Sequence, residues 1–340
     1  MKLLTCASYH GTGSSAVTNL IDECDNVHDM GDYEFRFVQD PDGICDLEYN
    51  LVINNHRLNS GYAIKRYMKV VDFQNGNFLS KRYRGFFGNK WKELSEAYIA
   101  SLTDAEFEGY WHYDLIEKGG AAWFADRAVN KLYHKLLGKR AVGSLNVVLR
   151  GCKSYVSYPR EKFYDATKAY IDALFGSANT DGKEFVMADQ LVPPSNTMHY
   201  MRFFNDLKVV CVERDPRDLY ALGKAVWKDG VIPTDVENFC KWYKATRAHK
   251  QYENDDPSKV LRIRFEDMIF KYRATKDSIL AFCGIGEEHH VRPLTLFDPR
   301  ISVRNTQAYK SKKIDAKDIA YIEKELESEL YDFDDAEVNI

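Results

Sequence analysis

The feature that most constrains this 340-residue chain is its first segment, where a short apolar run leads directly into a loop of small residues. Residues 2–7 have the apolar character of a buried strand, and residues 16–21 have the apolar spacing of the first turns of a helix. Between them lies the loop Ser8-Tyr9-His10-Gly11-Thr12-Gly13-Ser14-Ser15. This order of strand, loop and helix is typical of a phosphate site, because loop amides and the helix dipole both favour an anion.

This loop differs from two common nucleotide-binding loops. A Walker A loop has a lysine after its last glycine, but here Ser14 and Ser15 follow Gly13, which argues against ATP-dependent kinase chemistry. A dinucleotide-binding loop has a third glycine where Ala16 stands, and no acidic residue ends a plausible second strand about 20 residues further on. A tight connection without a ligand is the simple alternative, and the position directly after the first strand favours the phosphate site.

The later apolar runs predict an α/β protein with a central parallel sheet. Buried strands are predicted at residues 184–189, 208–213 and 259–265. Helical patterns lie between and after them, at residues 235–250, 273–283 and 315–329. This alternation predicts a three-layer fold like that of P-loop proteins, with helices on both faces of the sheet.

Residues 30–180 are rich in aromatic side chains and have a mixed pattern. We expect a largely helical insertion there, with helices near residues 92–103, 121–137 and 161–175. The chain has no internal repeat, no low-complexity tract and no obvious linker. We therefore expect a single domain over residues 1–340.

Charge and cysteine content argue against several classes of protein. Aspartate and glutamate (51) outnumber lysine and arginine (47), so the chain lacks the basic excess of a nucleic-acid-binding protein. The first apolar run is too short for a signal peptide or a membrane span, and no later run is long enough. The seven cysteines are scattered and form no C-x-x-C pair, which favours reduced thiols, a cytoplasmic location and no structural metal.

A second motif is the strand that ends in Arg214-Asp215-Pro216-Arg217-Asp218 and continues into a helix. The planar guanidinium of Arg214 suits a phosphate, and Asp215 and Asp218 suit the start of the helix. A cluster of surface ion pairs is the plain alternative. Together with the first loop, this segment resembles the 3′-phosphate motif of sulfotransferases that use 3′-phosphoadenosine-5′-phosphosulfate (PAPS).

Three more segments resemble the same family. Residues 260–268 with 279–285 resemble its late strand, Glu-Asp turn and following helix end, and residues 302–310 resemble a loop that closes over the nucleotide in glycan-modifying members. Residues 189–194 resemble the element that bears or borders the catalytic base. The sequence departs from the family where many members have a loop lysine, here Gly11, and where a serine usually follows the second motif, here Leu222.

The resemblance implies a sulfotransferase and assigns roles to its residues. We expect Arg214 to bind the 3′-phosphate of PAPS or of its product 3′-phosphoadenosine-5′-phosphate (PAP). The 5′-phosphosulfate is expected at Gly11, Thr12, Gly13, Ser14 and Ser15, with Lys224, Arg304 and Lys310 as further cofactor-binding residues. Asp189 is the expected catalytic base, while His10 is expected near the bridging oxygen or as the alternative base. Sulfuryl transfer needs no metal clamp, so none is expected.

The acceptor is expected to be a hydroxyl of a carbohydrate, either a polysaccharide or a lipid-linked oligosaccharide, with peripheral membrane contact in the second case. Residues 110–113 and 86–92 offer aromatic faces and cations for such an acceptor, on an insertion that forms the acceptor side. A small alcohol or phenol remains an alternative acceptor. A nucleotide or sugar kinase and a non-catalytic PAPS-binding or PAP-binding protein remain alternative functions.

Overall fold

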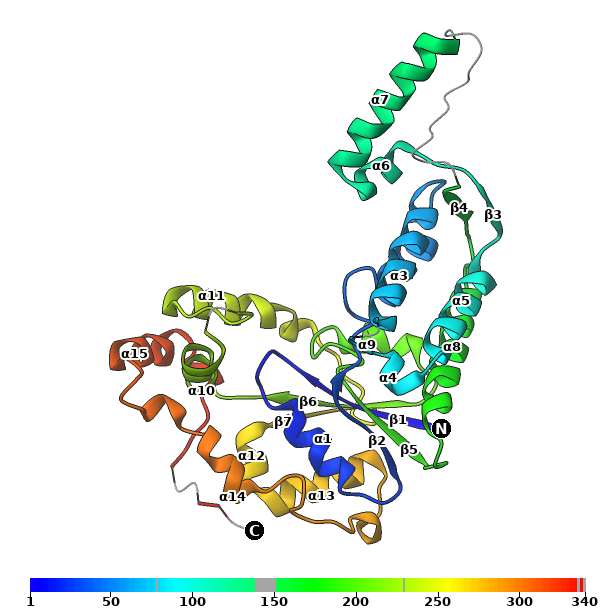
Figure 1. The fold of residues 1–340 in the computed structure, drawn as a ribbon. Helices are drawn as coiled ribbons and strands as arrows, with labels where there is room; N and C mark the ends of the chain where they lie inside the picture. Colours follow the sequence, from blue (N-terminus) through cyan, green and yellow to red (C-terminus); the bar gives the residue numbers. More distant parts are fainter. Residues whose placement is uncertain (78, 138–150, 229, 335–336, 339–340) are drawn as a thin grey trace.

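The computed structural model describes residues 1–77, 79–137, 151–228, 230–334 and 337–338. Its centre is a sheet of five parallel strands in the order β2-β5-β1-β6-β7 (Figure 1). The strands are β1 (Lys2–Ser8), β2 (Val27–Glu34), β5 (Phe185–Asp189), β6 (Leu207–Glu213) and β7 (Val260–Arg264). The predicted α/β fold with a parallel sheet is therefore confirmed, and four of the five strands lie where the apolar runs predict them.

Both faces of the sheet are covered, because successive side chains of β1 point to opposite sides. Leu3 and Ala7 belong to a core shared with α3 (Asn59–Asn75), α5 (Lys90–Leu102) and α8 (Lys162–Ala178). Leu4 and Cys6 belong to a second core shared with α1 (Ser14–Asp22), α12 (Phe265–Phe270) and α13 (Tyr272–Cys283). A sheet between two helical layers is the predicted three-layer arrangement.

A third apolar cluster is formed by helices that follow β6 in the chain. It is formed by α10 (Pro216–Leu222), α11 (Val236–Arg247) and α15 (Ala316–Glu325), which pack around residues such as Phe239. Helix α10 continues into a π-helical turn, η4 (Gly223–Trp227). In Figure 1 these helices stand together beside the sheet.

The segment between β2 and β5 is the predicted largely helical insertion. It contains α2 (Ile44–Glu48), η1 (Tyr49–Ile53), α3, α4 (Arg84–Phe87), α5, α6 (His112–Lys118), α7 (Gly120–Leu137) and α8, with a small antiparallel pair of strands, β3 (Ala105–Glu108) and β4 (Lys153–Val156). The remaining short helices are α9 (Thr197–Tyr200), α14 (Pro299–Ser302), η3 (Met201–Phe203), η5 (Ala248–Tyr252), η6 (Glu287–His289), η7 (Val303–Asn305), η8 (Ala308–Lys310) and η9 (Glu327–Glu329). Among the described helices, none is long and apolar enough to cross a membrane.

Of residues 86–92, expected to offer aromatic faces and cations to a sugar, Phe87 and Trp91 lie in the core of the insertion, whereas residues 88–90 are exposed. Trp91 is fully buried and donates its indole N–H to the Val71 carbonyl at 2.9 Å. Its ring packs edge-on against Tyr83, with centroids 4.8 Å apart, and Phe87 is also buried. These aromatic side chains therefore stabilise the insertion and are not available to an acceptor.

Strand β2 is the element that the sequence analysis missed, and it corrects two expectations. It is an edge strand with a single neighbour, β5, and its sequence VHDMGDYE has no apolar run of the kind that marks a buried strand. Because β2 ends at Glu34, the insertion leaves the sheet after that residue and not at residue 30. The expectation that no acidic residue ends the second strand is likewise wrong.

Candidate active site

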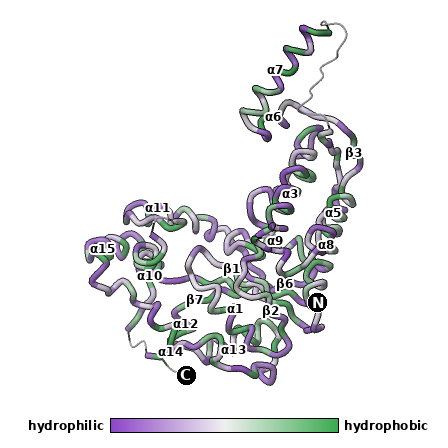
Figure 2. Tube along the Cα trace, in the orientation of Figure 1, coloured by the Kyte–Doolittle hydropathy of each residue, from purple (hydrophilic) through white to green (hydrophobic). Residues whose placement is uncertain are grey.

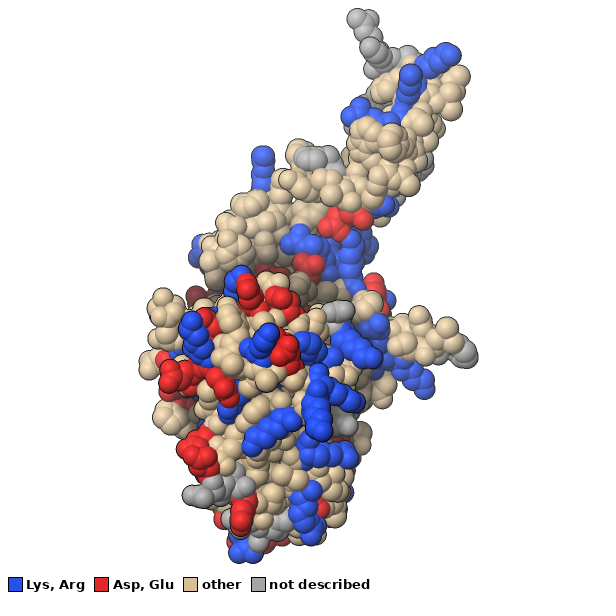
Figure 3. Space-filling model, turned by 90° about the vertical axis from the view of Figure 1, so that its left-hand side faces the viewer, with Lys and Arg blue, Asp and Glu red and all other residues tan. Residues whose placement is uncertain are grey.

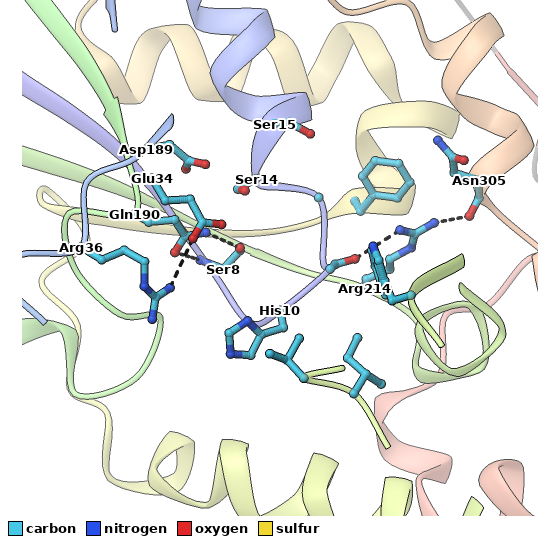
Figure 4. Close-up of a pocket in the computed structure, with 16 residues that line it drawn as sticks. Ser8, His10, Ser14, Ser15, Glu34, Arg36, Asp189, Gln190, Arg214 and Asn305 are labelled. Atoms are coloured by element: carbon cyan, nitrogen blue, oxygen red, sulfur yellow. Dashed lines mark hydrogen bonds and ion pairs between the residues drawn. The ribbon is translucent and has the colours of Figure 1, made fainter. Parts of the chain in front are cut away.

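A cavity of about 450 Å³ lies at the carboxyl edge of the sheet, where parallel strands place their functional ends. It brings together residues that are far apart in the sequence, from the first loop, the ends of β2, β5 and β6, and the C-terminal region (Figure 4). Its lining is Ser8, His10, Gly11, Gly13, Ser14, Ser15, Glu34, Arg36, Asp189, Gln190, Arg214, Trp227, Val231, Ile232, Phe265 and Asn305.

The first loop has a backbone shape that only glycine allows at two positions. Gly11 has φ of 74° and Gly13 has φ of 107°. A Cβ atom would come within 2.3 Å of the Trp227 ring at Gly11 and within 2.6 Å of the Phe265 ring at Gly13. Gly13 is also the N-cap of α1, and among the described side chains none caps that helix. The first amides of α1 are thus open to an anion in the cavity.

Thr12 stands apart from the other loop residues. Its hydroxyl is buried and donates towards two backbone carbonyls, those of Tyr9 and Val212, each at 2.8 Å. Its amide donates to the Tyr9 carbonyl at 3.0 Å. Because these contacts occupy both groups, Thr12 joins the loop to β6 and does not line the cavity.

Arg214 lies directly after β6 and faces the same cavity as the loop. Its side chain is only 5% exposed, and its guanidinium carbon lies 4.5 Å from the centre of the Phe265 ring. It donates to the Gly11 carbonyl at 3.3 Å and to the Asn305 carbonyl. Burial lowers the pKa of Arg214, although a guanidinium remains charged in a protein. A buried cation therefore lies beside the first loop.

Two aspartates hold the segment around Arg214 in place. Asp215 is the N-cap of α10, where it accepts from the Arg217 amide at 2.8 Å, and it pairs with the Arg217 guanidinium at 2.7 Å. Asp218 does not cap that helix. It is fully buried and accepts from the Gln307 amide at 2.8 Å, and burial raises its pKa to about 7. Asp218 thereby fastens the C-terminal loop close to Arg214.

Three expected cofactor residues do not line the cavity. Lys224 pairs with Asp318 at 2.7 Å and donates to the Tyr220 hydroxyl at 3.0 Å. Lys310 donates to its neighbour Gln307, and Arg304 is exposed. The residue of the C-terminal loop that reaches the cavity is Asn305. Neighbouring residues of a short 3₁₀-helix point in different directions, so the sequence alone does not tell which of them faces a ligand.

The side of the cavity opposite Arg214 is polar and charged (Figure 4). Asp189 ends β5, is 4% exposed and pairs in register with Glu34, the last residue of β2. Next to Asp189, the Gln190 amide nitrogen donates to the Ser8 hydroxyl at 2.5 Å. Two carboxylates from neighbouring strands thus face one cavity, which gives two candidate proton acceptors.

Arg36 and Glu34 are site residues that the sequence analysis missed. The Arg36 guanidinium lies 3.7 Å from the Glu34 carboxylate and 2.9 Å from that of Asp40. Desolvation and then Arg36 lower the pKa of His10, so its imidazole is neutral at neutral pH. The guanidinium of Arg36 is a cation at the same cavity. The sequence signal for these two residues is an acidic and a basic side chain at the end of a polar strand and just after it.

His199 and two neighbouring groups form a separate cluster at α9 and α2. Its imidazole lies 3.3 Å from the Glu48 carboxylate and 3.5 Å from the Cys45 thiol. Arg202 pairs with Glu48 at 2.9 Å and lies 2.8 Å from His199. Since the Arg202 guanidinium already pairs with the Glu48 carboxylate, the cluster is an ion pair on a buried glutamate and does not suit a metal ion.

Comparison with known proteins agrees with this geometry. Residues 92–289, more than half of the chain, match the model of the sulfotransferase family. A comparison with curated proteins finds no sequence relative. Among solved structures, the sulfotransferase domain of the Synechococcus PCC 7002 olefin synthase aligns over 97% of this chain and 94% of its own, at 11% identity and a TM-score of 0.44.

Two further solved structures align over most of the chain. Sulfotransferase STF1 from Mycobacterium tuberculosis H37Rv covers 96% of this chain and 76% of its own, with 10% identity and a TM-score of 0.34. A retinol dehydratase, solved with androsterone and the inactive cofactor PAP, covers 100% and 83%, with 12% identity and a TM-score of 0.33. From the extent of the family match, the chain belongs to the sulfotransferase family and is a PAPS-dependent sulfotransferase.

Proposed function

We propose that this enzyme transfers the sulfuryl group of PAPS to a hydroxyl of a carbohydrate, either a polysaccharide or a lipid-linked oligosaccharide. The observation that carries the choice of acceptor is the polar side of the cavity, formed by Ser8, Glu34, Arg36, Asp189 and Gln190. Such groups can make many hydrogen bonds to the hydroxyls of a sugar. A phenol or a sterol would leave these polar groups without partners and is therefore disfavoured.

PAPS is proposed to span the cavity from the first loop to Arg214. The amides of Gly13, Ser14 and Ser15 at the start of α1 would bind the 5′-phosphosulfate, as helix starts bind anions elsewhere. The guanidinium of Arg214 would bind the 3′-phosphate with two parallel hydrogen bonds, in place of the carbonyls that it now contacts. Donors at the two ends of one cavity support this placement.

Transfer then needs a base on the acceptor side. As the acceptor oxygen forms its bond to sulfur, the bond from sulfur to the bridging phosphate oxygen breaks, PAP leaves and the acceptor proton passes to a carboxylate. We propose Asp189 as this base because it lies at the end of a central strand, with Glu34 and His10 as the alternatives. Arg36 and a neutral His10 would stabilise the negative charge that develops on the leaving phosphate.

A second cavity supports a carbohydrate acceptor. It measures about 200 Å³ and lies between α3 and the β3-β4 strands, where Tyr62, Tyr110 and Trp111 line it together with Arg57 and Lys65. Aromatic rings and cations in one small cavity suit the faces of sugar rings and the acidic groups of a glycan. We propose that it binds a part of the acceptor chain remote from the reacting hydroxyl, on the acceptor-side insertion.

Transfer of labelled sulfate from PAPS to a panel of acceptors tests this function. We expect turnover on a polysaccharide or oligosaccharide, and none above background on a simple phenol or a sterol. W111A is expected to raise KM for a long glycan by about tenfold without changing KM for PAPS. Turnover on the phenol alone would contradict the proposed acceptor class and leave the donor chemistry intact.

We also propose that the reaction needs no metal ion. A sulfuryl group carries less charge than a phosphoryl group, and Arg36 and Arg214 supply cations at the cavity. We expect turnover in excess chelator to equal turnover in excess magnesium. A loss of more than half of the rate in chelator, restored by magnesium, would contradict this.

A further inference from the structure

Helices α6 and α7 form an arm that projects away from the rest of the molecule (Figure 1). Helix α6 is joined to the body by ion pairs, since Asp114 pairs with Lys65 at 2.6 Å and Glu117 pairs with Lys69. Helix α7 follows directly, and of its described residues only Asp126 is buried. An 18-residue helix is therefore presented almost entirely to its surroundings.

One side of α7 is apolar. Residues spaced three and four apart lie on one side of a helix, and this places Ala121, Ala125, Ala128, Leu132 and Leu136 in a single stripe. Leu136 is 72% exposed and Leu132 is 57% exposed. Figure 2 shows the resulting alternation of hydrophobic and hydrophilic residues along α7. An exposed apolar stripe that contains two leucines is a candidate interaction surface.

The side of α7 that adjoins this apolar stripe is basic. Arg127, Lys131 and Lys135 follow one another at a spacing of four residues, and His134 lies beside them. Within the described part of the chain, no acidic side chain pairs with these three cations. The single acidic residue of α7, Asp126, is buried and accepts from Asn130 at 3.0 Å. Figure 3 shows the basic side chains along the projecting arm.

Aromatic side chains at the start of α7 lie on its basic side, where the Arg127 guanidinium carbon is 5.0 Å from the centre of the Trp123 ring. Trp123 and Phe124 lie in the first turn of α7, with ring centroids 5.0 Å apart, and Phe124 is 69% exposed. Tyr113 and Ile116 are exposed on α6. An exposed helix with an apolar stripe, a neighbouring basic side and aromatic rings is of the kind that lies in the headgroup region of a membrane.

We propose that the α6-α7 arm binds the surface of a membrane that contains anionic lipids. The apolar stripe would enter the boundary between headgroups and acyl chains, and the basic side chains would pair with the lipid phosphates. A second copy of the chain is a poorer occupant, because its arm would bring another set of basic residues against the first. This surface goes beyond the transfer reaction, and its test does not depend on turnover.

Sedimentation of the full-length protein with vesicles tests the proposal. The protein is expected to bind vesicles of equal parts phosphatidylcholine and phosphatidylglycerol more tightly than vesicles of phosphatidylcholine alone. K131E/K135E is expected to weaken binding to the anionic vesicles by at least about tenfold, as each basic residue near such a surface contributes about fivefold. L132Q/L136Q is expected to weaken it by at least about tenfold through lost apolar burial.

Matched control variants show whether a loss of vesicle binding is specific to α7 or follows from any similar change on the surface. I53Q/L296Q removes two exposed apolar side chains from the body, and K90E/K241E reverses two exposed lysines there. Both are expected to bind as the wild type does, and circular dichroism checks that each variant folds. Absence of wild-type binding, or equal binding by L132Q/L136Q, would overturn the proposal. So would a wild-type dimer that L132Q/L136Q converts to a monomer without any vesicle binding.

Discussion

At the scale of single residues, the donor site depends on charges that are buried and held in fixed positions. Arg214 is stacked on Phe265 and lies close to the first loop, while the buried Asp218 holds the C-terminal loop beside it. On the opposite side, Asp189 and Glu34 come from neighbouring strands. The placement of these groups before any ligand arrives reduces the reorganisation that the reaction requires.

The assignment of the base predicts different effects for two isosteric variants. D189N removes the proton acceptor that we propose, so kcat is expected to fall by about 10² to 10⁴ while the Kd for PAP changes little. E34Q, the matched control on the neighbouring strand, is expected to reduce kcat by less than about tenfold. Single-turnover kinetics with PAPS and calorimetry with PAP provide the two measurements. The reverse ranking would assign the base to Glu34.

The pKa of Asp218 predicts how stability depends on pH. Burial raises this pKa from 3.8 to about 7, so between those values the folded state holds a proton that the unfolded state has released. The stabilising contribution of this proton is present at low pH and is lost as the pH rises towards 7. The wild type is therefore expected to lose up to about 1.4 kcal/mol per pH unit relative to D218N in this window.

Urea unfolding of the ligand-free protein at several pH values checks the expectation for Asp218. The difference in unfolding free energy between D218N and the wild type should shift in favour of D218N as the pH rises from 5 to about 7. D277N, a variant of an exposed aspartate, should show no such shift. A pH-independent difference for D218N would contradict the raised pKa.

At the scale of elements, the local sequence pattern was sufficient to predict the strands that are buried, because burial requires a run of apolar residues. Strands β1, β5, β6 and β7 are apolar runs between two helical layers, and the loop after β1 has small residues because rings pack against its backbone. Strand β2 pairs only with β5 and has a polar sequence, in which Val27 and Met30 are the buried apolar residues. The acceptor side of the cavity was therefore found only in part, as Glu34 and Arg36 lie at the end of this strand and just after it.

The loop after β1 predicts a strong effect for one small substitution. G13A adds a Cβ atom at a backbone φ of 107° and within 2.6 Å of the Phe265 ring, so we expect a stability loss of about 1–3 kcal/mol. The affinity for PAP is expected to fall at least about tenfold, because the amides at the start of α1 move. G31A is the matched control, since Gly31 also has a positive φ but no atom close to the added Cβ.

Thermal unfolding and calorimetric titration with PAP measure both effects. G31A should lose stability through backbone strain but retain its affinity for PAP. If G13A bound PAP as tightly as the wild type, the start of α1 would not be the binding site for the 5′-phosphate.

At the scale of the whole molecule, the chain consists of a sheet whose carboxyl edge lines the larger cavity and an insertion that extends away from that sheet (Figure 1). Four of the five strands could be predicted because they are apolar runs of the kind that marks buried strands. The arrangement of the insertion could not, because aromatic residues such as Trp91 and Trp111 have the same sequence character although one is buried and the other exposed. Long-range packing decides between the two.

The central claim is that one bisphosphorylated adenosine joins the first loop to Arg214, and calorimetric titration of wild type and R214A with two nucleotides tests it most directly. PAP carries the 3′-phosphate, and adenosine 5′-monophosphate lacks it. We expect R214A to weaken PAP binding by at least about thirtyfold, equivalent to about 2 kcal/mol, and to change the affinity for the monophosphate by less than about twofold. An equal loss for both nucleotides, or no loss for PAP, would contradict the account.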